Sequence, residues 1–294
     1  MTFLTKRANP KKLSTGTSGQ VTTLRSKVIS YSILVFFAII ILYPLVWLLM
    51  ASLKTLEELT FNTWGFVRNP QPRNFYLAWT RAGLGQLMIN SIRTASLTVI
   101  LTVITCTPMA FVLSRFKFVG RRLLYFVVIT GMMIPIHAAI IPLYLMVFRM
   151  DMMNNLTMLA FIYGAFRIPI SVFILEGYMS TIPKELEECA YIDGCSVFRL
   201  FWNIIVPLSR DVIATVAILA VIAAWNELMV AMLLISDMSL RTLPIGLAGF
   251  LSEYHSEHTQ LAAGALLAVI PTLLFYLVAQ ERMQKGLTAG ALKG

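Results

Sequence analysis

Long apolar runs dominate the sequence, and the first of them extends from Val28 to Leu53. About 20 consecutive apolar residues cross the hydrocarbon core of a bilayer as a helix. A secretory signal peptide has an apolar core of only about 7–15 residues and a small-residue cleavage site, so we interpret the first run as an uncleaved spanning helix. Five further runs cover residues 87–113, 123–148, 158–178, 210–235 and 261–280. The sequence therefore predicts an all-α membrane protein with six transmembrane helices.

The composition agrees with a membrane protein. Charged residues make up 13% of the chain, against about 25% in soluble domains, and the mean hydropathy is +0.77. A net charge of +10 could indicate a nucleic-acid partner. The basic residues, however, sit in short segments beside the apolar runs, where they act as orientation signals in a lipid bilayer. We therefore expect no nucleic acid as a partner.

The distribution of Lys and Arg predicts the orientation. Sixteen of them lie in the two tails, in the 114–122 loop and in the polar interval up to Arg210, whereas the connections on the other side hold six. Because positive charge accumulates in cytoplasmic loops, both termini should be cytoplasmic, and 236–260 should be an external loop. We divide the chain into a basic tail (1–27), a spanning domain (28–280) and a second tail (281–294).

The polar interval 179–209 carries helical signals of its own. Pro183 suits a first helical turn, and acidic residues follow where the helix dipole favours them. Leu186, Cys189 and Ala190 then share one face, and Gly194 can end the helix in a left-handed conformation. The pattern predicts a surface helix and a glycine break.

A second helix is expected after that break. Ser196 can cap it, and Pro207 should interrupt its pattern. Its predicted apolar face consists of Val197, Phe198, Phe201, Ile204 and Ile205.

The chain contains the pattern E-x-A-x-x-D-G, then nine further residues, then I-x-x-P. This arrangement resembles the EAA loop of ABC-importer permeases. In that family the loop forms a coupling helix that docks into a groove on a separate ATPase subunit. Cys189 stands here for the first alanine and Val206 for the usual leucine. The resemblance implies ATPase coupling through Glu188, Cys189, Ala190, Asp193, Gly194, Ile204 and Pro207.

Further motifs resemble the carbohydrate-uptake permeases of the maltose transporter's second-subunit type. They are R-T-L-P-I-G-L from Arg241, L-A-A-G from Leu261 and the ending G-L-T-A-G-A-L-K-G. The segment M-I-P-I-H-A-A-I-I-P-L-Y resembles the third span of sugar permeases. The likeness runs from about Val28 to the end of the chain. It implies the type I ABC importer permease fold and sugar import across a bacterial or archaeal cytoplasmic membrane.

The same resemblance implies the partners. They are a second homologous permease, two ATPase subunits or domains, and an extracellular sugar-binding protein. The chain lacks G-x-x-x-x-G-K-[ST], the loop that cradles nucleotide phosphates. We therefore expect no enzymatic activity and no cofactor in this chain, with ATP and Mg²⁺ bound by the partner ATPase. No His, Cys, Asp or Glu set has metal-site spacing, and Cys106, Cys189 and Cys195 give no disulfide framework.

Placing an ionisable residue at the bilayer centre costs roughly 2.5–3.5 kcal/mol of insertion free energy. Such residues inside predicted spans are therefore candidates for a functional or structural role. One interpretation is a polar lining for a hydrophilic substrate, with an aromatic ring able to face a sugar. The other is that Arg167 and Glu227 pair and lock two helices together. The translocation-path candidates are His137, Arg167, Trp225, Asn226 and Glu227.

In the maltose-type family the external loop before the last span reaches into the binding protein. The resemblance therefore makes four residues candidate contacts, and the alternative is an ordinary solvated loop. They are Tyr254, His255, Glu257 and His258.

Other classes of transporter or enzyme remain as alternatives. An ABC permease for a glycerol phosphodiester or another small polar solute would share these motifs. An ion-coupled secondary transporter should show an inverted repeat and midplane carboxylates, and neither is evident. A membrane-embedded enzyme would need a catalytic constellation, and none stands out.

Overall fold

A computed structural model describes residues 24–81, 83–253 and 258–291, and no strand occurs among them. The chain forms two compact units, residues 1–46 and 47–294. In the first unit, the described part is the start of helix α1 (Leu24–Leu53), in which the apolar side chains from Val28 to Tyr43 are exposed on all sides. A helix that is apolar all round belongs in a membrane or against other chains.

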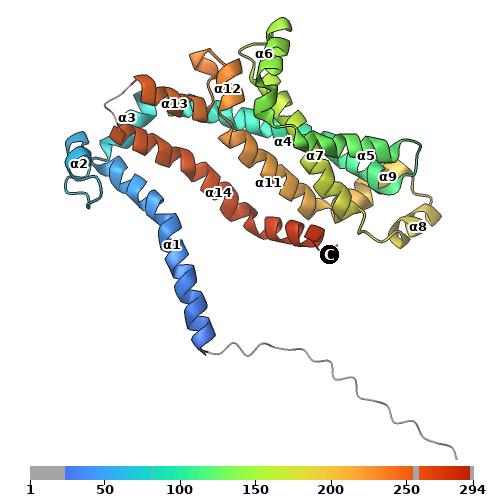
Figure 1. The fold of residues 1–294 in the computed structure, drawn as a ribbon. Coiled ribbons are helices and arrows are strands. Elements are labelled where there is room, and N and C mark those ends of the chain that lie inside the picture. Colours follow the sequence, from blue (N-terminus) through green and yellow to red (C-terminus); the bar gives the residue numbers. More distant parts are fainter. Residues whose placement is uncertain (1–23, 82, 254–257, 292–294) are drawn as a thin grey trace, which may run out of the picture. The chain divides into compact units, whose positions relative to one another are not determined.

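The second unit is a bundle of helices (Figure 1). Its elements after α1 are α2 (Leu56–Phe61), α3 (Arg73–Arg81), α4 (Leu84–Arg115), α5 (Arg121–Thr130), η1 (Gly131–Met133), η2 (Ile136–Ala139), α6 (Ile140–Arg149), α7 (Leu156–Met179), α8 (Glu185–Ile192), α9 (Val197–Leu200), η3 (Phe201–Ile205), α10 (Val206–Leu208), α11 (Arg210–Asn226), α12 (Met229–Leu234), η4 (Met238–Leu240), α13 (Leu243–Glu253) and α14 (His258–Ala291).

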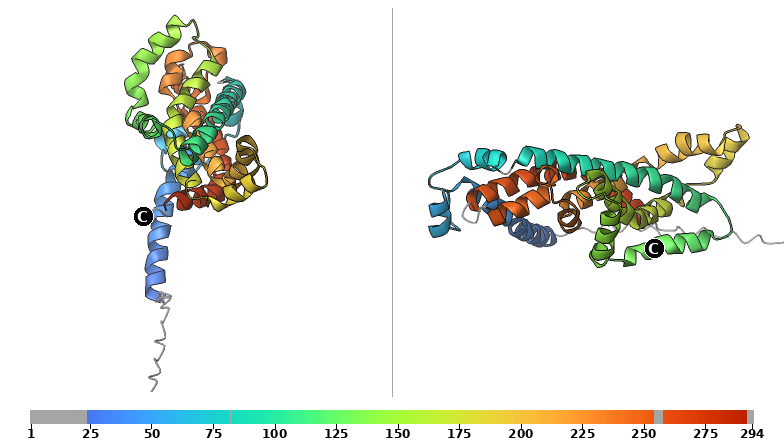
Figure 2. Two further views of the ribbon diagram at one scale, coloured as in Figure 1. Left: turned by 90° about the vertical axis from the view of Figure 1, so that its right-hand side faces the viewer. Right: turned by 90° about the horizontal axis from the view of Figure 1, so that it is seen from above.

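Helices α4, α7 and α11 lie side by side and form the centre of the bundle, and α14 packs on α11 (Figure 2). One buried cluster lies towards the end of α4 and α7 that adjoins α8, and it includes Leu113, Leu175 and Leu200. A second lies at the opposite end of α7, where Leu159 packs near Val230. The clusters hold the two ends of α7 in place.

The predicted third span is sharply bent. Residues 121–133 and 136–149 are inclined by 91°. The break falls at Ile134 and Pro135, which are both extended, because a residue before proline avoids the helical region and proline has no N–H to donate. Pro142 lies in the first turn of α6, where proline is tolerated.

The predicted fifth span, 210–235, is not one helix. Helix α11 ends at Asn226, and α12 starts at Met229 after two non-helical residues. At its other end, α11 is bent by 74° from the run 197–208. By length and composition, four described helices can cross a membrane, or up to six if each bent pair is one span.

A buried lysine organises the connection after α1, inside the second unit. Lys54 is fully buried, and its Nζ donates to the carbonyl oxygens of Asn62 (2.6 Å), Thr63 (3.3 Å) and Gly65 (2.7 Å). Asn74 Nδ2 donates to the carbonyls of Ser52 and Lys54. Asn74 lies in the first turn of α3, so these bonds attach that helix to the end of α1.

The 236–260 connection is more ordered than a loop, since it contains η4 and α13. Asn154 Oδ1 accepts hydrogen bonds from the backbone N–H groups of Ser236 (2.7 Å) and Asp237 (2.9 Å). From α4, Asn90 Nδ2 donates to the carbonyl of Arg241 at 2.9 Å. These bonds tie the connection to the same end of the bundle as α3.

Candidate functional site

The polar interval folds as a helix, a glycine break and a second helix, as predicted. Helix α8 has its C-cap at Asp193, and Gly194 follows with φ of +76°. The N–H of Gly194 donates to the carbonyl of Tyr191 at 3.0 Å, and that of Cys195 to Ala190 at 2.9 Å, which satisfies carbonyls left over at the helix end. Pro183 precedes the N-cap Lys184, so it lies outside the first turn that we assigned to it.

The second helix is capped as expected, because Ser196 Oγ accepts from the N–H of Arg199 at 3.4 Å. Its predicted apolar face is confirmed for Phe201 and Ile205, which are buried. Phe198 is instead 74% exposed, and Leu200 is buried. A π-helical segment, η3, follows α9. Pro207 lies within α10, and the chain bends only at Ser209.

Helix α8 rests on the bundle through Glu187 and Ala190, which are both buried. Of the three residues that we predicted to share one face, Ala190 is buried against the bundle, whereas Leu186 and Cys189 are exposed. The surface that α8 presents outward contains Glu188, Cys189, Tyr191, Ile192 and Asp193. Ile192 is 85% exposed, so this surface offers an apolar tip as well as acidic groups.

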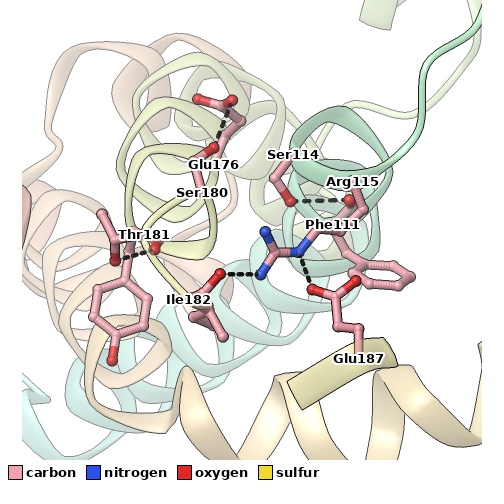
Figure 3. A network of polar contacts seen from close by, with 9 residues as sticks. Phe111, Ser114, Arg115, Glu176, Ser180, Thr181, Ile182 and Glu187 are labelled. Carbon is pink, nitrogen blue, oxygen red and sulfur yellow. Dashed lines mark hydrogen bonds and ion pairs between the residues drawn. The ribbon is translucent and has the colours of Figure 1, made fainter. Parts of the chain in front are cut away.

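A buried ion pair fastens α8 to α4 (Figure 3). Arg115, the last residue of α4, places Nε 2.5 Å from Oε1 of Glu187. Its Nη2 donates to the carbonyl of Ile182 at 3.0 Å. Burial raises the pKa of Glu187, against the lowering effect of Arg115 and Lys184. The pair joins a spanning helix directly to the candidate coupling helix.

Two more bonds connect the surroundings of α8. Tyr178, near the end of α7, donates its hydroxyl to the carbonyl of Leu208 at 3.0 Å. Ser180 Oγ donates to Glu176 at 3.1 Å (Figure 3). From the sequence we assigned Glu187 only to the helix dipole and Arg115 only to membrane orientation. The sequence did hold a signal for this ion pair. Arg115 lies at the end of a predicted span, and Glu187 lies in the acidic first turn of a predicted surface helix on the same side of the membrane.

At the break of the fifth span, Glu227 is held from two sides. Tyr163 of α7 donates its hydroxyl to Glu227 Oε2 at 2.6 Å. The carboxylate also accepts from the N–H groups of Val230 (3.0 Å) and Ala231 (3.1 Å) at the start of α12. Among the described residues no ion pair joins it to Arg167, which lies one turn after Tyr163 and is half-buried. Of the two interpretations, the one in which Arg167 and Glu227 pair is therefore not supported by the described contacts.

The other candidates for the translocation path lie in different settings. Trp225 is buried, and its ring centroid is 6.2 Å from that of Phe275, so it does not offer a face to a sugar on this chain's surface. Asn226 is exposed and donates Nδ2 to the carbonyl of Ile222 at 2.7 Å. His137 is exposed in η2, beside the bend of the third span.

Of the external candidates, Tyr254, His255 and Glu257 lie outside the described residues. His258 is exposed and begins α14. Within the described part of the chain, no three His, Cys, Asp or Glu side chains are grouped to hold a metal ion. The cysteines are free thiols.

Comparisons with known proteins place the chain in a family. The model of the binding-protein-dependent transport system inner membrane component matches residues 104–288. A putative ABC transporter permease protein of Caldicellulosiruptor sp. is 39% identical over 85% of this chain and 91% of its own. The melibiose/raffinose/stachyose import permease of Bacillus subtilis is 33% identical over 85% of this chain and 91% of its own.

A solved structure shows the same fold. It is the crystal structure of a bacterial ABC transporter involved in the import of the acidic polysaccharide alginate, with a TM-score of 0.73 and 23% identity over 87% of this chain and 95% of that one. The chain therefore belongs to the inner membrane components of binding-protein-dependent transport systems, the permease proteins of ABC transporters.

Proposed function

We propose that this chain is a permease subunit of an ATP-driven importer of mono- or oligosaccharides, delivered by an extracellular binding protein. Relatives named for melibiose, raffinose and stachyose import, diacetylchitobiose uptake and arabinooligosaccharide transport support this substrate class. The chain would form half of the pathway, with a second homologous permease as the other half and two ATPase subunits or domains binding ATP and Mg²⁺.

In this proposal the chain crosses the bacterial cell membrane six times in the type I importer arrangement, with both termini and α8 in the cytoplasm. The excess of Lys and Arg on that side supports the orientation. The bent pair 121–149 supplies the third span, and α11 with α12 supplies the fifth. External residues around 254–258 would then meet the binding protein.

The observation that carries the proposal is the attachment of α8. Its outer surface, with Glu188, Cys189 and Asp193, is open to a partner. Its inner surface is joined to α4 through Arg115 and Glu187. A partner that moves α8 would therefore move α4, the helix that packs along α7 and α11. ATP would act by changing the contacts of the ATPase with α8 between two states, as only differential contacts shift an equilibrium.

Broken spans support a pathway along this bundle. The bend at Pro135 and the gap between α11 and α12 expose backbone groups inside predicted spans. Such backbone is tolerated in membranes where protein or a water-filled cavity satisfies it. Asn226, His137 and Arg167 are the polar side chains near these features that we keep as candidates for substrate contact.

Reconstitution tests the proposal. The chain is co-purified with its second permease and ATPase subunits, placed in vesicles, and supplied with the binding protein and a panel of labelled sugars. We expect uptake of at least one sugar that requires both internal ATP and the binding protein. Uptake driven by a proton or sodium gradient without ATPase subunits would contradict the proposal. Uptake of a glycerol phosphodiester alone would retain the transporter class and reject the sugar.

A further inference from the structure

A basic cleft lies beside the turn that joins α4 to α5. It has a volume of about 1030 Å³. Its walls come from the turn, from the first residues of α5 and from α7. The lining includes Lys117, Val119, Arg121, Arg122, Tyr125 and Glu176. None of them belongs to the coupling surface of α8 or to the translocation-path candidates.

The cleft carries positive charge that the protein does not neutralise. Residues 114–122 contain four Lys or Arg and no acidic residue. The guanidinium of Arg121 already has partners within the protein. Its Nε donates to the carbonyl of Leu113 at 2.6 Å, and its Nη2 lies 3.8 Å from Oε1 of Glu176. Lys117 and Arg122 are exposed, and neither has a carboxylate partner among the described residues. Glu176 is the one acidic wall residue, and it also accepts from Ser180.

Apolar surface adjoins these cations. Val119 is fully exposed at the tip of the turn. Along α5, Leu123, Phe126 and Val127 are exposed too, so an apolar face leads away from the cleft. Free cations at the end of an apolar helix face match the border between headgroups and acyl chains. A soluble phosphate would use the cations but would leave this apolar face without a partner.

We propose that this cleft binds the phosphate headgroup of an anionic phospholipid, whose acyl chains lie along the exposed face of α5. Lys117 and Arg122 would contact the phosphate oxygens, with Arg able to bind two of them at once. Arg121 would stay on Leu113 and Glu176. Basic pockets at the cytoplasmic ends of spanning helices recognise such headgroups, and the Lys and Arg bias assigns this turn to that side.

The test is a lipid titration of the full chain in detergent, followed by native mass spectrometry with phosphatidylglycerol as the probe. Each surface cation contributes about 1 kcal/mol to anionic-lipid binding, so K117Q/R122Q should raise the half-saturating lipid concentration about 30-fold. The matched control is R68Q/R73Q, which removes two exposed cations from the connection before α4. It should shift half-saturation by no more than about twofold.

Further titrations distinguish a phospholipid headgroup from a soluble phosphate compound as the ligand of the cleft. Phosphatidylcholine should not show the same dependence on Lys117 and Arg122, and millimolar glycerol 3-phosphate should not displace phosphatidylglycerol. Equal retention by the wild type and K117Q/R122Q would overturn the proposal. Full displacement by glycerol 3-phosphate would assign the cleft to a soluble anion instead. Loss of the lipid when the partner proteins are bound would make the cleft a protein interface, which also overturns it.

Discussion

Arg115 and Glu187 form a buried ion pair, with Nε 2.5 Å from Oε1 and side chains only 5% and 10% exposed. The two residues come from a spanning helix of 32 residues and a surface helix of eight. Isolated helices shorter than about 12–15 residues are marginal in water, so α8 depends on its contacts with the bundle. The pair therefore fixes where the outer surface of α8 points.

Breaking one half of this pair should destabilise the protein more than removing both halves. Removal of one partner leaves an uncompensated buried charge, which costs about 3–5 kcal/mol, whereas replacing both with apolar residues is often neutral. We expect Arg115→Met or Glu187→Met alone to lower the melting temperature of the purified protein, and the double variant to recover most of the loss. Additive losses in the double variant would show that the pair is not coupled. Arg68→Met, at an exposed position, is the control.

The same carboxylate predicts a pH dependence. Burial raises the pKa of Glu187 in the folded protein, so the folded state binds this proton more tightly than the unfolded state. The contribution to stability is then full below the unfolded pKa of about 4.3 and is lost as pH rises through the folded pKa. The melting temperature of the wild type, compared with that of Glu187→Gln, should therefore fall as the pH rises above the unfolded pKa. A difference that rises over this range would contradict the assignment.

A third prediction concerns the break in the fifth span. Tyr163→Phe removes the hydroxyl that donates to Glu227 at 2.6 Å and keeps the ring. Loss of a hydrogen bond to a charged group costs about 1.5–3 kcal/mol, so the melting temperature should fall. Tyr163→Phe should have little further effect in a Glu227→Gln background, because the charged acceptor has already gone. Tyr76→Phe, on an exposed tyrosine, should change nothing, and an equal loss there would remove the basis for this prediction.

Much of the fold follows from local signals in the sequence. Apolar length predicted the helices that became α1, α4, α7 and α14, and Ser196 and Gly194 marked the boundaries between α8 and α9. The details that failed depend on the rest of the structure. In the second helix Leu200 is buried in place of the predicted Phe198, because the packing of α9 on the bundle decides which side chains it covers. The partner of Glu227 proved to be a neutral Tyr163 rather than a charged Arg167, a choice that only the packing of α7 on α12 decides.

In the function that we propose, α8 and its glycine break transmit the work of an ATPase to the bundle. Gly194 has φ of +76°, and a Cβ added there would meet no other heavy atom within 4 Å, so only its backbone conformation resists substitution. Gly194→Val should cost about 1–3 kcal/mol locally and redirect Asp193 and Ala190, while the spans still insert. Asn tolerates the left-handed region, so Gly194→Asn is the matched control.

The direct measurement is sugar uptake together with binding-protein-stimulated ATPase activity, in vesicles that contain the assembled complex. We expect Gly194→Val to assemble but to lose uptake and stimulation together, while Gly194→Asn keeps most of both. Wild-type uptake and stimulation in Gly194→Val would contradict the assignment of this loop as the coupling element.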